Sequence, residues 1–404
     1  MSFASATLTG VLSISVEQRR ARLVRRHRLA PECAASSVVD AADSVVVLHA
    51  TDPATVYLSA LARCPDASLA DISTAMYDER TLVKMIGMRR TMFVAPTPLA
   101  PVVHAAAGLE IAARLRRQLV KQLQTLPTEP EIGDDVESWL ADVETSTERA
   151  LAGMGEAFAN ELAEAEPRLR TAILPTTEKK WDVKQNITSR VLTLMGADGR
   201  LVRGRPGGTW LSRMHRWMST RELWPDGMPE TPELEARVAL ARAWLRAFGP
   251  GTVADLKWWT GWTLGSTRKV LTEIDTVEVD LDGDVGVVLA DDVEPEEAVE
   301  PSAALLPALD PTPMGWQQRD FYLGPHREPL FDRNGNIGPT VWWDGRIVGG
   351  WGMKNGEIVW RMLEDVGAEA ETAVAKVAAG LQDRLEAATV VPSFRTPLET
   401  SLTT

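Results

Sequence analysis

The amino-acid sequence predicts a mainly α-helical protein with small β-hairpins, divided into several domains. The chain has 404 residues, and domains hold about 150 residues on average, so one core is too few. Hydrophobic residues make up 45% of the chain and charged residues 25%, which is typical of a folded protein and excludes a disordered one. A helix-turn-helix pattern followed by a hairpin pattern occurs three times. This order is typical of winged helix-turn-helix units, and a strand-rich segment follows the third.

Helix-start signals organise the N-terminal region. Ser15 and Gln18 have the spacing of a capping box, so we expect the first helix to begin there. The apolar run from 38 to 49 predicts a second helix. Asp52 followed by Pro53 is a strong start signal for a third, with Asp as the N-cap and Pro as the first helical residue. The extended segments that follow predict the first hairpin.

Glycine turns mark the other hairpins. The second follows a helix and is built around residues 203–208, Arg-Gly-Arg-Pro-Gly-Gly, which we interpret as a wing. The third has Asp282-Gly283 at its turn, a preferred pair for a tight hairpin. Beyond it, Asp344-Gly345 and Asn355-Gly356 lie between apolar runs and predict a group of C-terminal strands. A closing helix is expected from about 368 to 387.

The turn signals and changes in composition divide the chain into four predicted segments. These are 1–100 for the first winged-helix unit, 101–230 for a helical connector and the second unit, 231–300 for the third unit, and 301–404 for a C-terminal β-rich extension with its closing helix. No repeated residue pattern accompanies the three units, so the prediction depends on the order of elements alone.

Charge is distributed unevenly along the chain. The net charge of −13 argues, taken globally, against a nucleic-acid partner. Locally, 19–28 holds six arginines and no acid, 168–221 holds twelve basic residues against three acids, and 272–300 holds twelve acids and no base. Since salt screens charges beyond about 8–10 Å, only local fields matter to a polyanion. A basic surface on this acidic protein is therefore allowed.

The sequence lacks the motifs that are typical of several classes of protein. No apolar stretch approaches the roughly 20 residues that span a bilayer, and the N-terminus does not read as a secretory signal. The two cysteines, Cys33 and Cys64, form no CxxC, so we expect neither a disulfide framework nor a cysteine zinc site, and a reducing cytoplasm fits. HExxH, GxxxxGK[ST] and a helix-opening GxGxxG are absent. We therefore expect no cofactor, neither metal nor nucleotide.

Three runs carry a family resemblance: HATDPATVYLSALAR at 49–63, AMYDERTLVKMIGMRRTMFVAP at 75–96 and ALLPALDPTPMGW at 304–316. With them the chain resembles, over roughly 15–365, the winged-helix family that contains the bacterial crosslink-repair DNA glycosylases. The resemblance implies three tandem winged-helix units. It also implies cleavage of the bond between deoxyribose and an N7-alkylated purine, including crosslinked bases. These glycosylases carry Gln-x-Gln just before Asp-Pro, where this chain has His49-Ala50-Thr51.

That position makes His49, Thr51 and Asp52 the candidate catalytic residues. An N7-alkylated purine leaves as a neutral base from a cationic precursor, and the sugar becomes oxocarbenium-like, so the site needs a placed water and nearby negative charge. His49 could orient or deprotonate the water, Thr51 could hold it, and Asp52 could supply the charge. The structural alternatives stay open: Asp52 as an N-cap, Thr51 as a turn residue, and His49 as a half-buried structural histidine.

Basic residues near the predicted helix and wings are the candidate DNA contacts. A solvated surface is the alternative for each of them, and phosphate contact is favoured where acids are missing. The candidates are Arg19, Arg22 and Arg26 on the first helix, Lys84, Arg89 and Arg90 at the first hairpin, and Arg203, Arg205 and Arg213 at the second.

The sequence therefore predicts a winged-helix DNA-binding protein that acts as a monofunctional DNA glycosylase on alkylated or crosslinked purines. A non-catalytic DNA-binding or regulatory protein is the alternative, and a protein-interaction role is a third reading of the negative net charge. We expect a cytoplasmic, monomeric protein with double-stranded DNA as its partner and no membrane association. The lesion and any preferred DNA sequence stay open.

Overall fold

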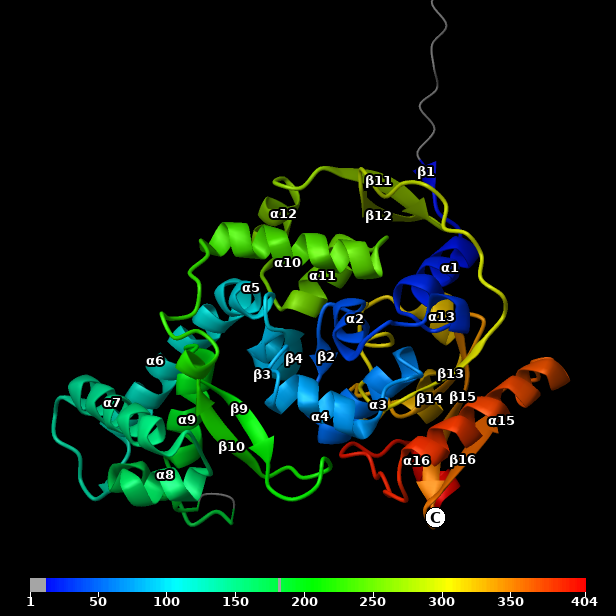
Figure 1. Cartoon of the computed structure of the whole chain (residues 1–404). Helices are drawn as coiled ribbons and strands as arrows, with labels where there is room; N and C mark the ends of the chain where they lie inside the picture. The colour runs from blue at the N-terminus through cyan, green and yellow to red at the C-terminus, as the bar shows by residue number, and fades with distance from the viewer. Residues whose placement is uncertain (1–11, 181–182) are drawn as a thin grey trace, which may run out of the picture. The chain divides into compact units, whose positions relative to one another are not determined.

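The structure is a computed structural model that describes residues 12–180 and 183–404 (Figure 1). The chain divides into two compact units, one formed by Met1–Ala35 with Ala241–Thr404 and the other by Ser36–Leu240. Among the described helices, none combines the length and the hydropathy that crossing a bilayer requires. In the same residues, no group of three His, Cys, Asp or Glu side chains is arranged to hold a metal ion.

The unit Ser36–Leu240 begins with short helices and a hairpin. In order these are α2 (Val38–Asp43), β2 (Leu48–His49), α3 (Pro53–Arg63), α4 (Leu69–Tyr77), β3 (Leu82–Gly87) and β4 (Thr91–Pro96). The predicted cap of α3 is confirmed, because Asp52 accepts a hydrogen bond from the Ala54 amide and Pro53 is the first helical residue. The predicted helix over 38–49 is wrong beyond Asp43: its last residues form a strand. The helix ends in a turn in which Val46 has a φ of 66°, and Leu48 and His49 then pair with Val94 and Phe93 of β4.

A helical layer and a second hairpin complete this unit. Its elements are α5 (Ala100–Val103), α6 (Leu109–Thr125), β5 (Thr128–Glu129), α7 (Val136–Met154), β6 (Glu156–Ala157), α8 (Ala159–Ala165), β7 (Ala172–Ile173), β8 (Gln185–Asn186), α9 (Thr188–Ala197), β9 (Leu201–Pro206) and β10 (His215–Ser219). The amphipathic α6 packs on α7 and α9. Helix, strand, glycine turn and strand thus follow one another after 188, as the sequence predicts.

The two hairpins of this unit do not stand apart as separate wings. They join in one six-stranded sheet with the order β2-β4-β3-β9-β10-β6. The joint is the pairing of β3 with β9, where Lys84 lies opposite Arg203. An unpaired strand edge readily accepts another strand, which accounts for the merger. It also moves Arg203 from an expected wing into the interior of a sheet.

The other unit contains the N-terminal helix and the third hairpin. Its first elements are β1 (Leu12–Ser13), α1 (Val16–Arg26), α11 (Val253–Thr260), α12 (Leu264–Leu271), β11 (Thr276–Leu281) and β12 (Asp284–Leu289), while α10 (Glu233–Phe248) spans the point of division. Ser15 caps α1 by accepting from the Gln18 amide, as predicted. The third hairpin turns at Asp282 and Gly283, both with positive φ, and β1 extends it as a parallel neighbour.

A four-stranded sheet follows in the same unit and agrees with the predicted strand-rich C-terminal segment. The remaining elements are β13 (Ala303–Leu306), α13 (Asp320–Leu323), α14 (Arg327–Leu330), β14 (Thr340–Trp343), β15 (Arg346–Lys354), β16 (Glu357–Met362), α15 (Gly367–Arg384) and α16 (Pro397–Thr403). The sheet runs β13-β14-β15-β16, with its tight turns at Asp344-Gly345 and Asn355-Gly356. Trp342 and Trp351 are buried in its core.

Candidate active site and nucleic-acid interface

The junction between β2 and α3 holds the three candidate catalytic residues. His49 ends β2 opposite Phe93 of β4, and their rings meet edge to face with centroids 5.5 Å apart. Only 7% of His49 is exposed. The Thr51 amide donates a hydrogen bond to Nδ1 of His49 at 3.5 Å. The imidazole therefore contributes a hydrogen bond to the turn between β2 and α3.

Thr51 and Asp52 present different groups at the start of α3. Thr51 is exposed, and within the described part of the chain its hydroxyl makes no hydrogen bond. Asp52 is buried, and its Oδ1 accepts from the Ala54 amide at 3.2 Å. Backbone N–H groups and the helix dipole favour negative charge at this end of α3. An exposed hydroxyl and a buried carboxylate thus occupy adjacent sequence positions at the N-terminus of α3.

Lys84 of β3 lies close enough to Asp52 to interact with it electrostatically. Its side chain is half-buried, and its pKa is lowered to about 8, first by burial and then by the Arg203 charge, against the opposing effect of Asp52. Arg203 lies over the Trp217 ring, 3.6 Å from the centroid, and burial lowers its pKa to about 9. At pH 7 both side chains are cations.

His215 of β10 completes this group, which we call the sheet cluster: Lys84, Arg203, His215 and Trp217. Burial, and then the charges of Arg203 and Lys84, lower the pKa of His215 to about 4, so its ring is neutral at pH 7. In the part of the chain that the structure describes, neither the Lys84 ammonium nor the Arg203 guanidinium forms an ion pair or donates a hydrogen bond. Two adjacent cations without such partners favour an anion from outside.

The other predicted contacts of this unit differ in availability. Arg205 is already paired, with its Nη2 2.5 Å from an Asp78 carboxylate oxygen. Arg213 is exposed in the loop between β9 and β10. Arg89 and Arg90 are exposed at the turn between β3 and β4, where both have positive φ. The structure thus brings Lys84 and Arg203 together beside Asp52 but does not add Arg205 to them.

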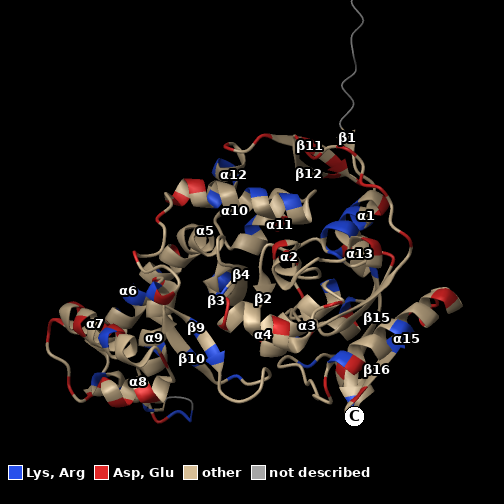
Figure 2. Ribbon diagram, in the orientation of Figure 1, with Lys and Arg blue, Asp and Glu red and all other residues tan. Residues whose placement is uncertain are grey.

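The arginines of α1 belong to the other unit and are mostly neutralised there. Figure 2 shows basic residues along α1 and acidic residues in the segment that follows β12. Arg26 forms two hydrogen bonds to the Asp292 carboxylate, at 2.8 and 2.7 Å, and one to Glu296. Arg22 is 1% exposed and donates to the carbonyls of Asp292 and Glu294. Both arginines already pair with Asp292, so we do not expect them to contact DNA.

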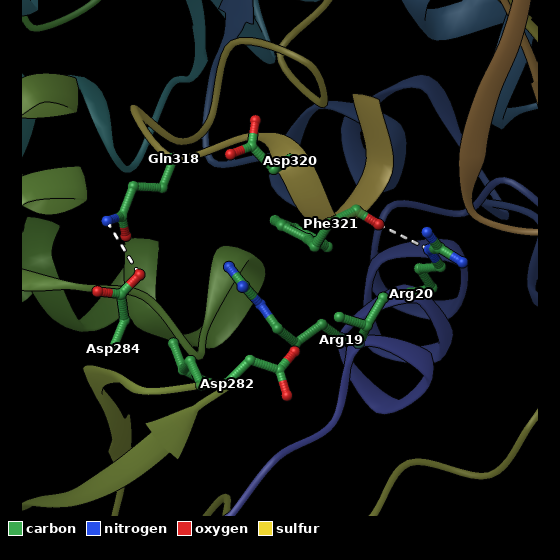
Figure 3. A pocket seen from close by; sticks show the side chains of 9 residues that line it. Arg19, Arg20, Asp282, Asp284, Gln318, Asp320 and Phe321 are labelled. Carbon is green, nitrogen blue, oxygen red and sulfur yellow. Dashed lines mark hydrogen bonds between the residues drawn. The ribbon is translucent and has the colours of Figure 1, made fainter. Parts of the chain in front are cut away.

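Arg19 lines a pocket of 360 Å³ that contains acidic as well as basic residues (Figure 3). Its guanidinium lies 3.7 Å from the centre of the Phe321 ring. The pocket is also lined by the carboxylates of Asp282, Asp284 and Asp320. Three carboxylates disfavour a phosphate, so we do not expect Arg19 to contact DNA either.

The ion pairs of Asp292 with Arg22 and Arg26 are expected to stabilise the folded protein. Replacing Asp292 by Asn is expected to cost about 3 kcal/mol of unfolding free energy, because the buried Arg22 loses the carboxylate with which it pairs, while Arg26 keeps Glu296. Urea denaturation measures this. The neighbouring Asp291→Asn is the control, since Asp291 pairs with Arg246 at an exposed position and its loss should leave the denaturation midpoint nearly unchanged. Equal denaturation midpoints for the two variants would contradict a stabilising role of Asp292.

Sequence reasoning missed His215 and Trp217 as members of the sheet cluster. The pattern of β10 could have indicated them, because alternate residues of a strand share a face and Trp217 lies opposite Arg203. No local signal could have placed Lys84 beside them, since the pairing of β3 with β9 joins strands about 120 residues apart in sequence.

The fold resembles that of a solved DNA glycosylase. The chain is similar in structure to the Streptomyces sahachiroi DNA glycosylase AlkZ, with a TM-score of 0.68 and 19% sequence identity over 94% of this chain and 99% of that one. The family model described as "DNA glycosylase AlkZ-like" matches residues 42–384. The chain belongs to this family, which confirms the family-level resemblance seen in the sequence.

A characterised relative gives a narrower match. The "Interstrand DNA cross-link repair glycosylase" of Streptomyces sahachiroi is 33% identical over 143 residues, which is 33% of this chain. The aligned part spans 38% of that relative's length. The family model therefore establishes that the chain belongs to a DNA glycosylase family. The substrate and the mechanism have to be inferred from the residues of the site.

Proposed function

We propose that the protein is a monofunctional DNA glycosylase that hydrolyses the N-glycosidic bond of N7-alkylated or crosslinked purines in double-stranded DNA. Family membership and the name of the characterised relative support this proposal. The observation that carries it is the β2–α3 junction, where the exposed Thr51 and the carboxylate of Asp52 lie next to the sheet cluster. A reacting sugar and its flanking phosphates need these two kinds of group side by side.

The chemistry assigns a role to each residue of the junction. The Thr51 hydroxyl holds the attacking water by a hydrogen bond. The Asp52 carboxylate stabilises the positive charge that develops on the sugar, and it accepts the proton that the water loses. His49 is a positioning residue, because its Nδ1 holds the Thr51 amide and so fixes the direction of the hydroxyl. The departing base needs no protonation, since N7 alkylation already makes it a good leaving group.

The sheet cluster would bind the DNA backbone next to the reacting nucleotide. Lys84 and Arg203 supply two cations without ion pairs at one place, and phosphates are the anions that duplex DNA offers. Arg89, Arg90 and Arg213, all exposed in the same unit, extend the proposed contacts. This surface is positive locally although the chain as a whole is acidic.

We further interpret the three helix–hairpin groups as winged-helix units, with the four segments predicted from the sequence as their bounds. The groups end in the hairpins β3–β4, β9–β10 and β11–β12. We propose that the protein acts as a monomer in the cytoplasm without a nucleotide or metal cofactor. The free, buried thiols of Cys33 and Cys64 are compatible with that reducing compartment.

Base release tests the proposed reaction directly. A duplex with one N7-alkylguanine, or with a crosslink, is incubated with the purified protein, and alkali then cleaves any abasic site. Release that requires the protein supports the proposal. Duplex binding without any release favours the alternative, a non-catalytic DNA-binding protein, and the burial of His49 is the observation that favours it.

The positioning role of His49 has its own test. His49→Ala is expected to lower the rate constant of release about 100-fold while the substrate concentration for half-maximal rate stays within a few-fold. His49→Asn offers an acceptor to the Thr51 amide and should recover most of the rate. If Asn behaves like Ala although both variants unfold at the wild-type temperature, the hydrogen bond to Thr51 is not what His49 contributes.

A further inference from the structure

A second basic site lies in the same unit, away from the residues of the sheet cluster. It is a small pocket of 70 Å³ between the β3–β4 turn, α6 and α9. Its polar lining consists of Arg90, Arg190, Gln118, Gln122 and Thr193. Two leucines of α6 form the rest of the wall, and no carboxylate lines it among the residues that the structure describes.

The helices build this pocket through their periodicity. Positions 115, 118, 119 and 122 of α6 share one face, because residues three and four apart are neighbours on a helix. Arg190 and Thr193, three residues apart on α9, form the opposing face in the same way. Helices α6 and α9 pack against each other, and the leucines and glutamines of α6 line the pocket between them.

Arg90 comes to the pocket from a strained turn. Arg89 and Arg90 have φ of 56° and 63°, a backbone region that residues other than glycine rarely adopt. Two consecutive residues of this kind cost conformational energy and tend to be retained where the direction of a side chain matters. Here the turn places Arg90 against the helices, and its guanidinium forms no ion pair within the described chain.

Arg190 has hydrogen-bonding capacity left over. Its Nη2 donates to the Gln185 side chain at 2.6 Å. Its Nη1 is buried and has no acceptor among the described residues. A guanidinium presents several donors in one plane, which suits a tetrahedral oxyanion. The pocket holds about two waters at roughly 30 Å³ each, so one phosphate group fits and a nucleobase does not.

We propose that this pocket binds one phosphate group, held by Arg90 and Arg190 and oriented by the glutamine amides and the Thr193 hydroxyl. Two sources share this chemistry: a phosphodiester of the DNA backbone, or a free phosphate or phosphomonoester. The DNA source rests on the proposed function, whereas phosphate binding itself does not.

Inorganic phosphate is the probe for the pocket. The unfolding temperature is measured against phosphate concentration with ionic strength held constant by potassium chloride, because a ligand that binds only the folded state raises it. The unfolding temperature of the wild type should rise with phosphate concentration. Arg190→Gln and Arg90→Gln should each lower the affinity for phosphate about tenfold or more. Arg117→Gln is the matched control, since Arg117 is exposed on α6 and does not line the pocket.

Two results would overturn the proposal: no phosphate response in the wild type, or the same response in both pocket variants as in Arg117→Gln. Since each arginine is tested separately, one unstable variant leaves the other as the test. Base release plays no part in this measurement, so a failed glycosylase assay and a failed phosphate titration are distinguishable.

The salt dependence of duplex binding distinguishes the two sources. If the pocket binds a backbone phosphate, Arg190→Gln should lower the slope of log affinity against log salt by about one, because one phosphate contact is lost. Loss of the phosphate response with an unchanged slope supports the pocket and assigns it to a free phosphate or phosphomonoester.

Discussion

Replacing Asp52 by Asn is expected to lower the rate of base release about 100- to 1000-fold, the range that follows the loss of one electrostatic group aimed at a developing charge. Asn is as good an N-cap as Asp, so the hydrogen bond from the Ala54 amide and the start of α3 should persist. The variant therefore removes the charge and keeps the structure. Release from an N7-alkylguanine duplex under single-turnover conditions measures the effect.

Duplex affinity should change little in the same variant. Asp52 raises the pKa of Lys84, so its neutralisation lowers that pKa further, and at pH 6.5 the lysine still carries most of its charge. Loss of the negative charge of Asp52 also removes its repulsion of DNA phosphates, which favours duplex binding. Affinity within a few-fold of the wild type, together with lost release, separates catalysis from binding.

A second helix cap provides the control for this variant. Asp135 caps α7 by accepting from the Ser138 amide, and its replacement by Asn makes the same chemical change at another helix start. Asp135→Asn should release the base at the wild-type rate. If Asp52→Asn does so too, Asp52 is a helix cap and nothing more, and the proposed chemistry is wrong.

The sequence is a reliable guide where the structure depends on neighbours along the chain. The caps at Ser15 and Asp52, and the turn at Asp282-Gly283, depend on side chains within three residues of the backbone that they satisfy. The predicted helix at 38–49 fails where this locality ends. Its last residues, Leu48 and His49, are strand because β4 is available to pair with them.

The candidate site shows the same division. His49, Thr51 and Asp52 come together because they are adjacent in sequence. Arg203 and Lys84 come together through strand pairing over a long loop, which no local pattern encodes. Conversely, no local pattern in the basic run of α1 indicates the partners of Arg22 and Arg26, because both pair with Asp292 about 270 residues later.

Replacing Lys84 by Met is expected to weaken duplex binding about tenfold or more while making the protein more stable. A charged group that binds phosphate is lost, and a half-buried ammonium is exchanged for an apolar side chain of similar length. The slope of log affinity against log salt should fall by about 0.9. Fluorescence anisotropy at several salt concentrations and thermal denaturation measure the two effects.

The pH dependence follows from the pKa of about 8 in the folded protein against about 10.4 for an unfolded lysine. Below pH 8 both states are charged and the folded state carries the full cost of burying the ammonium. Between pH 8 and 10.4 the unfolded state binds more protons, so stability from this group rises with pH and the advantage of Met shrinks. Duplex affinity of the wild type should instead fall as pH rises above 8, because the cation that binds phosphate is lost.

Lys121→Met is the matched control, because it removes the same charge from an exposed position on α6. It should leave stability and the pH dependence of binding near those of the wild type. Lys84→Met should differ from it in both, and also lack the fall in affinity that the wild type shows between pH 7 and 9. If the two variants instead lose affinity equally and with the same pH profile, Lys84 contributes only to net charge, and the sheet cluster is not the place where the backbone binds.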